Sequence, residues 1–157
     1  MGLLLFGGCN NSHPASGASS VNELARGFVL YTVTLDAVKY VTLLHPNAVN
    51  YYERKWPGFF KAVLNGDMSR MSRNPADFRP ENVGVEPAPR DDYTQKEWAE
   101  ARAILGNTLP MDAYWFTYKE EGVGQLRLRV LVVQDDGRYY VTLPDFPEEL
   151  KPPKSRK

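Results

Sequence analysis

The sequence contains little of the chemistry from which active sites are usually built. Its 157 residues include one cysteine, Cys9, and two histidines, His13 and His45. A single cysteine cannot form an internal disulfide, so cysteine pairing gives no information about the redox compartment. No spacing of histidines, cysteines and acidic residues is typical of a metal site, and no phosphate-binding glycine loop or nucleophile motif is present. The sequence therefore predicts neither a metal nor a cofactor.

The sequence also lacks an excess of charge and a long apolar run. Lysine plus arginine and aspartate plus glutamate both total 19, so the formal net charge is zero, and no overall field attracts nucleic acid. No apolar run approaches the ~20 residues that a membrane-spanning helix needs. The composition, 43% hydrophobic and 24% charged, is typical of a globular protein. We therefore expect one domain that does not bind nucleic acid.

The single cysteine stands directly after a short apolar run, in the stretch LLLFGGC. A secretory signal has a basic start, an apolar stretch of roughly 7–15 residues and small residues before the cleavage point. Here the basic start is absent and the apolar stretch is too short, so we expect the chain to begin inside a leader. Residues 10 to 20 are small and polar, which is typical of a flexible tether. The first 20 residues are therefore interpreted as a truncated leader and a tether.

The phrase FGGC resembles the lipobox of bacterial lipoproteins, in which an apolar residue and two small residues precede a cysteine. The resemblance implies that the leader is cut before Cys9 and that the Cys9 thiol carries a diacylglyceryl group. Two or three acyl chains anchor a protein stably to a bilayer, whereas one chain does so only marginally. The protein would then be held at a bacterial membrane in the cell envelope, on the periplasmic or outer-membrane side. The alternative is a free or buried thiol in an irregular terminus.

Helical patterns dominate the chain from the tether to residue 105. Ser20 and Glu23 match a capping box, and apolar residues follow at helical spacing. Further helices are predicted in DAVKYVTLL, NAVNYYERKW and WPGFFKAVLNG, and in TQKEWAEARAIL, which begins with a second capping box at Thr94 and Glu97. Four prolines interrupt residues 69 to 93, which indicates a surface excursion or a short edge strand at residues 83 to 85.

From Asp112 onward, apolar and polar residues alternate as in half-buried strands. Strands are predicted in DAYWFTYK, QLRLRVLVVQ and RYYVTL, joined by turns at EEGVG and DDG. A two-residue turn at Asp136 and Gly137 places Val132 opposite Val141. We therefore expect a single α+β domain, residues 21 to 146, with N-terminal helices packed on one side of a curved antiparallel sheet. A basic, proline-containing tail, residues 147 to 157, follows this domain.

The order of these elements resembles the SnoaL-like, or nuclear transport factor 2-like, superfamily of cystatin-like fold. The resemblance rests on ELARGFVLYTV followed by DAVKYVTLLHPNAV, and on the closing LVVQDDGRYYVTLP. It implies a cone in which helices wrap a bent sheet and leave a pocket at the wide end. Because members of the superfamily include enzymes, ligand binders, dimerisation modules and immunity proteins, the fold does not select a function.

His45 is the one histidine in the predicted domain, since His13 lies in the tether. A histidine at a helix end, before Pro46, commonly contacts the terminal carbonyls, and this is the structural interpretation. The alternative is an acid/base in the pocket that the resemblance implies, with Asp36 or Asp112 as the acidic partner. The catalytic hypothesis is therefore a small SnoaL-like isomerase or hydrolase-like enzyme that uses His45.

The outer face of the predicted sheet combines aromatic, arginine and aliphatic residues. Trp115 is expected opposite Arg129, where the two side chains would form a cation–π contact. Aromatic residues and arginine are enriched in protein interfaces. This face is therefore either a contact with a protein partner or a second copy, or a partly covered sheet face. The residues expected on it are Trp115, Arg127, Arg129, Leu131 and Tyr140.

A second aromatic group, Tyr52, Trp56 and Phe60, either lines a ligand pocket or fills the core. The sequence as a whole predicts a membrane-anchored envelope lipoprotein whose α+β domain binds a ligand or a protein partner without catalysis. One alternative is the enzyme that uses His45. The other is an envelope immunity or interaction protein that works through the outer sheet face.

Overall fold

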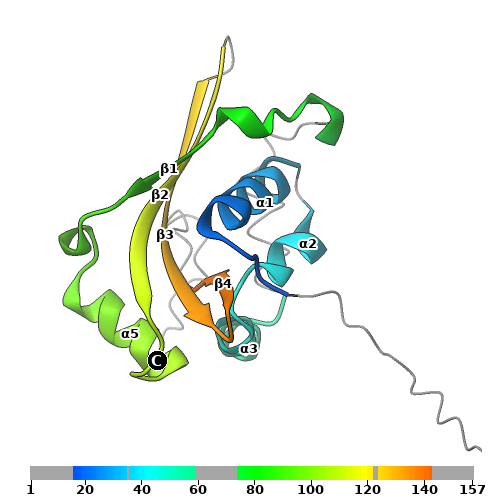
Figure 1. Cartoon of the computed structure of the whole chain (residues 1–157). Coiled ribbons are helices and arrows are strands. Elements are labelled where there is room, and N and C mark those ends of the chain that lie inside the picture. The colour runs from blue at the N-terminus through cyan, green and yellow to red at the C-terminus, as the bar shows by residue number, and fades with distance from the viewer. Residues whose placement is uncertain (1–15, 35, 59–73, 122–123, 143–157) are drawn as a thin grey trace, which may run out of the picture.

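The computed structural model describes residues 16–34, 36–58, 74–121 and 124–142. These residues form helices packed against an antiparallel sheet (Figure 1), which confirms the predicted α+β class. The elements, in chain order, are α1 (Val21–Thr34), α2 (Ala37–Thr42), α3 (Pro46–Lys55), the 3-10 turns η2 (Pro75–Asp77) and η3 (Pro80–Asn82), β1 (Val83–Pro87), the 3-10 turn η4 (Arg90–Asp92), α5 (Gln95–Leu105), β2 (Met111–Glu120), β3 (Gly124–Asp135) and β4 (Arg138–Val141).

The sheet is a meander with the strand order β1-β2-β3-β4, and neighbouring strands are antiparallel. The predicted register of β2 and β3 is confirmed, because Trp115 pairs with Arg129. The proline-rich stretch does contain an edge strand, β1, which pairs with β2. Alternate residues of each strand therefore point to opposite faces, as the sequence alternation indicates.

The β3–β4 hairpin has the tight turn that the sequence predicts. Asp136 and Gly137 both have positive φ, 49° and 71°, and this backbone suits the right-handed twist of the flanking strands. As a result Val132 pairs with Val141, which is the predicted register.

One face of the sheet, called the α1 face, packs on helix α1, and the sheet curves around this helix (Figure 1). The ring of Phe28 lies 6.1 Å from the ring of Phe116 in β2 and 4.7 Å from the ring of Tyr40 in α2. The N–H of Glu23 donates to the Ser20 hydroxyl at 3.1 Å, as expected for a capped helix start. The apolar stripe of the sequence is buried on this side, including Leu24, Ala25, Phe28, Val29 and Val33.

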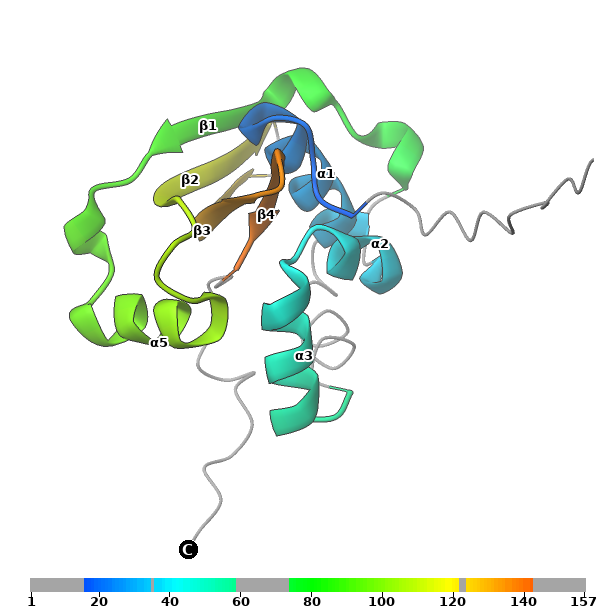
Figure 2. The ribbon, with the colours of Figure 1, turned by 60° about the horizontal axis from the view of Figure 1, so that its bottom comes forward.

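The opposite face of the sheet, called the α5 face, is partly covered by η4 and α5 (Figure 2). Arg129 shows this arrangement, since it pairs with Glu97 of α5 at 3.3 Å and stacks on Tyr93 at 4.3 Å. The expectation that the helices lie on one side of the sheet therefore holds for α1 but not for α5. The physical reason is that α5 has apolar residues of its own to bury, and Ala101 and Leu105 join the hydrophobic core.

The outer edge of β4 is covered by two segments from the N-terminal part of the chain. Ala18 forms an antiparallel bridge with Tyr139, and Leu44 forms a parallel bridge with Val141. Arg138 adds a hydrogen bond of 2.7 Å to the carbonyl of Gly17. Residues 16 to 20, which the sequence assigned to the tether, therefore contact the domain and protect a sheet edge.

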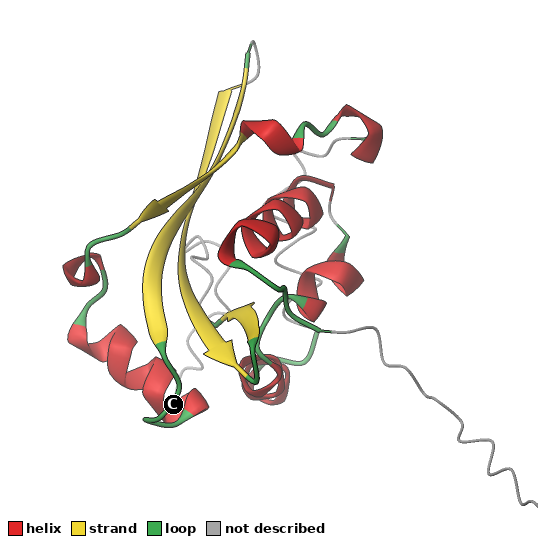
Figure 3. Ribbon diagram, viewed as in Figure 1, coloured by secondary structure: helices red, strands yellow, loops and turns green. Residues whose placement is uncertain are grey.

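Several predictions fall outside the described ranges, namely Cys9 with its leader, Phe60, and the basic tail at residues 147–157. Within the described ranges, helices, strands and the loops between them are distinguished in Figure 3. No helix there has both the length and the apolar character needed to cross a membrane.

Candidate functional site

Three stacks of an arginine on an aromatic ring lie on the α5 face and on the adjoining η4 and α5. The guanidinium of Arg127 lies 4.0 Å from the Trp115 ring centre. The other two stacks have separations of 4.3 Å, and the rings of Tyr93 and Trp98 meet edge to face at 5.8 Å. We call this group the arginine–aromatic stripe, and its members are Arg127 on Trp115, Arg129 on Tyr93, and Arg90 on Trp98.

Directional hydrogen bonds hold the stripe in place. The indole N–H of Trp115 donates to the Asp92 carboxylate at 3.3 Å, and Arg129 donates to the Asp92 carbonyl. Glu97 accepts from Arg129 at 3.3 Å and also from the N–H of Thr94 at 2.7 Å. The capping box that the sequence predicts at the start of α5 is confirmed, and its glutamate therefore also fixes an arginine of the stripe.

Exposure separates the stripe into an inner part and an outer part. The Arg129 side chain is 21% exposed, whereas that of Arg127 is 51% exposed and its ion-pair partner Glu86, at 3.7 Å, is 61% exposed. Trp115 is half-buried. The inner residues thus brace a surface whose outer residues, Trp115 and Arg127, are accessible to a partner.

The arginine that stacks on Trp115 is not the predicted one. Trp115 does lie opposite Arg129, but Arg129 turns to Tyr93, and Arg127 stacks on Trp115 instead. Arg127 is paired with Thr117, so it is the diagonal neighbour of Trp115, which is within reach of a long side chain.

Two residues predicted on the outer sheet face are buried. Leu131 is 0% exposed and Tyr140 is 9% exposed, so neither presents a binding surface. The hydroxyl of Tyr140 lies 3.4 Å from the Ser16 hydroxyl, and its ring contacts the ring of His45 edge to face at 5.2 Å. The segments that cover β4 therefore also cover this side chain. Trp115, Arg127 and Arg129 do lie on this face, and their contact with a partner stays a prediction.

His45 is buried, and both of its ring nitrogens have partners. Nδ1 accepts from the N–H of Asn47 at 3.2 Å, and Nε2 lies 2.8 Å from the Asp135 carboxylate. A neutral ring that accepts at Nδ1 carries its proton on Nε2 and donates it to Asp135. His45 is therefore the N-cap of α3, at the opposite kind of helix end from the one that the sequence interpretation assumed.

The acids proposed as partners of His45 have other roles in the structure. Asp36 caps α2 by accepting from the N–H of Lys39 at 3.1 Å, and Asp112 pairs with Arg90 at 3.5 Å. The acid that does contact His45 is Asp135, which sequence reasoning missed. No local pattern indicates this contact, because it joins residues 90 positions apart.

Tyr52 and Trp56 stack on each other in α3, with ring centres 5.6 Å apart. Tyr52 is buried in the hydrophobic core, and burial, followed by the charge of Glu100, raises the pKa of its phenol. Lys55 lies over the Trp56 ring at 4.6 Å. Tyr52 thus takes the core role that the sequence left open, and Phe60 lies outside the described ranges.

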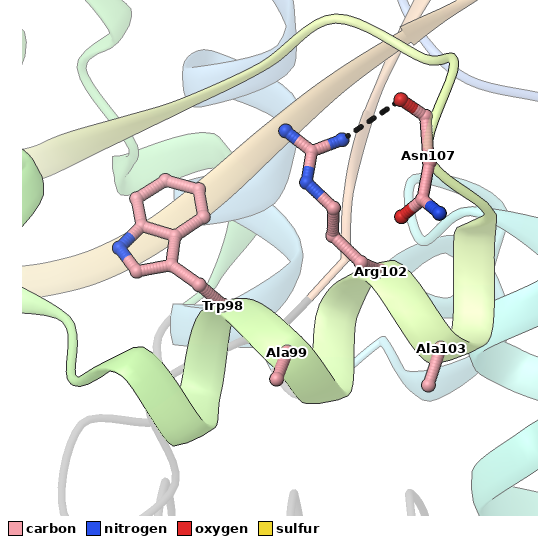
Figure 4. Close-up of a pocket in the computed structure, with 5 residues that line it drawn as sticks. All are labelled: Trp98, Ala99, Arg102, Ala103 and Asn107. Atoms are coloured by element: carbon pink, nitrogen blue, oxygen red, sulfur yellow. Dashed lines mark hydrogen bonds between the residues drawn. The ribbon is translucent and has the colours of Figure 1, made fainter.

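On the concave side of the sheet, the ring of Phe28 packs on the rings of Tyr40 and Phe116. A depression of about 450 Å³ lies on the outer surface of α5 (Figure 4). Sequence reasoning missed it, although two alanines four positions apart leave room beside larger side chains. Its lining residues are Trp98, Ala99, Arg102, Ala103 and Asn107.

Among the residues that the structure describes, no group of three His, Cys, Asp or Glu side chains could hold a metal ion. Comparison of the chain with protein-family models, with curated proteins and with solved structures finds no match. The SnoaL-like and lipoprotein resemblances therefore stay predictions from the sequence.

Proposed function

We propose that this protein is a lipid-anchored envelope protein whose α+β domain binds a protein partner through the arginine–aromatic stripe and catalyses no reaction. The observation that carries the proposal is the half-exposed stack of Arg127 on Trp115. Tryptophan, tyrosine and arginine dominate the binding energy of protein interfaces. The accessible part of the stripe supplies two of these types, tryptophan at Trp115 and arginine at Arg127, while Tyr93 is buried beneath it.

Hydrogen bonds within the domain already position Trp115 and Arg129 of the stripe without a partner. Trp115 is fixed by Asp92, and Arg129 by Asp92 and Glu97. Association loses affinity when side chains must be ordered on binding, so a surface that is already ordered binds more tightly. This supports recognition of a protein surface by the exposed edge of the stripe.

The anchor is proposed from the sequence around Cys9, and the position of Ser16, the first described residue, is compatible with it. The N-terminal end of the described chain lies on the other side of the molecule from η4 and α5 (Figures 1 and 2). Cys9 lies seven positions before Ser16, which is a reach of at most about 25 Å. A lipid on Cys9 would therefore hold the domain near the bilayer with the stripe turned away from it.

The environment of His45 favours binding over catalysis. A general acid or base needs a ring nitrogen within reach of the substrate. Both nitrogens of His45 are occupied, by the N–H of Asn47 and by Asp135, and the residue is 4% exposed. The enzyme hypothesis thus has no accessible acid/base at the residue on which it depended.

The binding surface is tested by photocrosslinking in cells that carry the full-length protein. A photoreactive residue replaces Glu86, which pairs with Trp115 in the sheet and is exposed, and the control replaces Arg54, exposed on α3. We expect a discrete crosslinked product from position 86 that Trp115→Ala abolishes, and none from position 54. A product of twice the chain mass would identify the partner as a second copy. The proposal is wrong if both positions give the same products, or if Trp115→Ala changes nothing.

The anchor is tested separately with Cys9→Ser in the same cells. We expect this variant to move from the membrane fraction to the soluble fraction, and intact mass to show acylation of the unchanged protein. An unmodified Cys9 in the native material would remove the anchor and leave the binding surface to be judged by the crosslinking alone.

A further inference from the structure

The depression on α5 contains an arginine, Arg102, that pairs with no carboxylate of the described residues. Arg102 donates to the backbone carbonyl of Asn107 at 3.2 Å, and within the described ranges it forms no ion pair. The arginines of the stripe differ in this respect. Each of them has a carboxylate at 3.3–3.7 Å, namely Arg90 with Asp112, Arg127 with Glu86, and Arg129 with Glu97.

The shape of the depression brings this charge next to an apolar surface. Figure 4 shows Arg102 rising from α5 between the indole of Trp98 and Asn107. Ala99 and Ala103 have only methyl side chains, so the surface of the helix beside Trp98 and Arg102 stays open. A ligand there would meet the guanidinium and the indole together. Trp98 also belongs to the stripe, so the depression continues the proposed binding surface.

We propose that this depression binds an acidic side chain of the protein partner, with an apolar group of the partner packed beside it. Arg102 has further N–H groups besides the one bonded to Asn107, and a carboxylate that accepts them forms charge-assisted hydrogen bonds. The indole of Trp98 then covers the apolar group. The depression is wide and open, and small-molecule sites usually enclose most of their ligand, so a side chain from a larger partner fits it better. The inference rests on the proposed function, because it takes the ligand to be part of a protein.

The test uses two capped dipeptides that differ only in charge, acetyl-Phe-Glu-amide and acetyl-Phe-Gln-amide. Each is titrated into the full-length, nitrogen-15-labelled protein, and the indole N–H signals of the three tryptophans are followed. Trp98→Phe assigns the signal at the depression, and Trp56 and Trp115 are internal references. We expect saturable shifts at Trp98, with the Glu peptide binding about two- to fivefold more tightly than the Gln peptide, as for an exposed ion pair.

Two arginine variants show whether the preference comes from the depression. Arg102→Gln should abolish the difference between the peptides. Arg54→Gln is the matched control, because Arg54 is also a helical arginine bonded to a backbone carbonyl, that of Asn50 at 3.1 Å, and it should keep the difference. Equal affinities for the two peptides, a preference that survives Arg102→Gln, or no saturable shift at Trp98 would each overturn the inference.

The source of the carboxylate is tested with acetyl-Phe-Gln that has a free terminal carboxylate. Tighter binding of this peptide than of the Glu peptide would mean that the depression takes a C-terminal carboxylate and not an acidic side chain, and would overturn the assignment. The crosslinking experiment at position 86 changes neither Arg102 nor Trp98, so the two proposals fail separately. A product from position 86 without a Glu preference at Trp98 would remove this inference alone.

Discussion

The two faces of the sheet are made by alternate residues of the same strands, yet different forces hold them. On the α1 face Phe116 is 0% exposed and packs on other rings. On the α5 face its sequence neighbour Trp115 is half-buried, carries an arginine on one side and donates to a carboxylate. The first arrangement is governed by the area removed from water, which has no preferred direction. The second depends on direction and charge.

The two faces therefore differ in their contribution to the free energy of folding. Burial of large apolar side chains supplies most of the folding free energy, and exposed ion pairs add little. The outer part of the α5 face therefore contributes little to stability, although the hydrogen bond from Trp115 to Asp92 and the ion pair of Arg127 with Glu86 hold its geometry. A surface that is ordered beyond the needs of folding is consistent with recognition of a partner.

The largest expected effect comes from replacing, one at a time, two adjacent residues that point to opposite faces. Phe116→Ala should lower the free energy of unfolding by about 3–5 kcal/mol, because a fully buried ring leaves a cavity. Trp115→Ala should lower it by only about 1 kcal/mol, since part of that ring is already in water. Urea unfolding followed by circular dichroism measures both, and an unchanged m-value ensures that the comparison is valid. Equal losses would mean that the α5 face is ordinary core, and would contradict the division into two roles.

A smaller difference is expected in alkaline solution. The pKa of Tyr52, on the α5 side, is raised by burial and then by Glu100, and the pKa of Tyr114, on the α1 face, is raised by burial and then by Asp112. Because the folded state holds these protons more tightly, their contribution is complete below the ordinary pKa of 10.0 and is lost as the pH rises towards the folded pKa. Phenylalanine cannot ionise, so Tyr52→Phe should flatten this decline in the free energy of unfolding.

The matched control for Tyr52 is Tyr114→Phe. Tyr52 is buried and Tyr114 is half-buried, so the flattening should be larger for Tyr52. Urea unfolding at a series of pH values between about 9 and 11.5, around the ordinary tyrosine pKa, provides the measurement. An unchanged slope for Tyr52→Phe would show that its proton is not held by the fold.

Much of the fold could be predicted from the sequence, because the relevant signals are local. The alternation of β2 and β3 and the two-residue turn at Asp136 fix the strand register. The capping box fixes the start of α5, and the Ser20 hydroxyl caps α1, where Glu23 accepts from the N–H of Ser19 and not of Ser20. The face on which α5 lies could not be predicted, since its apolar stripe shows that it packs but not against which surface. The bridges of Ala18 and Leu44 to β4 were missed for a related reason, because they join distant parts of the chain.

The candidate site was predicted only in part, although one available signal was not used. Along the same face of β3, Arg127 and Arg129 are followed by Leu131 and Val133. This change from charged to aliphatic residues marks the point along β3 where the α5 face becomes fully buried, as the burial of Leu131 confirms. The role of Asp92 could not be foreseen, because nothing local places a 3-10 turn beside β2 and β3.

The smallest expected effect distinguishes the inner and outer arginines of the stripe. Arg129→Gln removes the pair with Glu97 and the stack on Tyr93, and should lower the free energy of unfolding by about 1–2 kcal/mol, as for a hydrogen bond to a charged group. Arg127→Gln removes a half-exposed pair with Glu86 and should cost at most about 0.5 kcal/mol. In the crosslinking assay Arg127→Gln should have the larger effect, because Arg127 lies on the proposed contact surface, whereas Arg129 contacts Tyr93 and α5. If Arg127→Gln reduced stability more than Arg129→Gln, the assignment of inner and outer parts would be wrong, and the exposed edge would be a structural brace and not the contact surface.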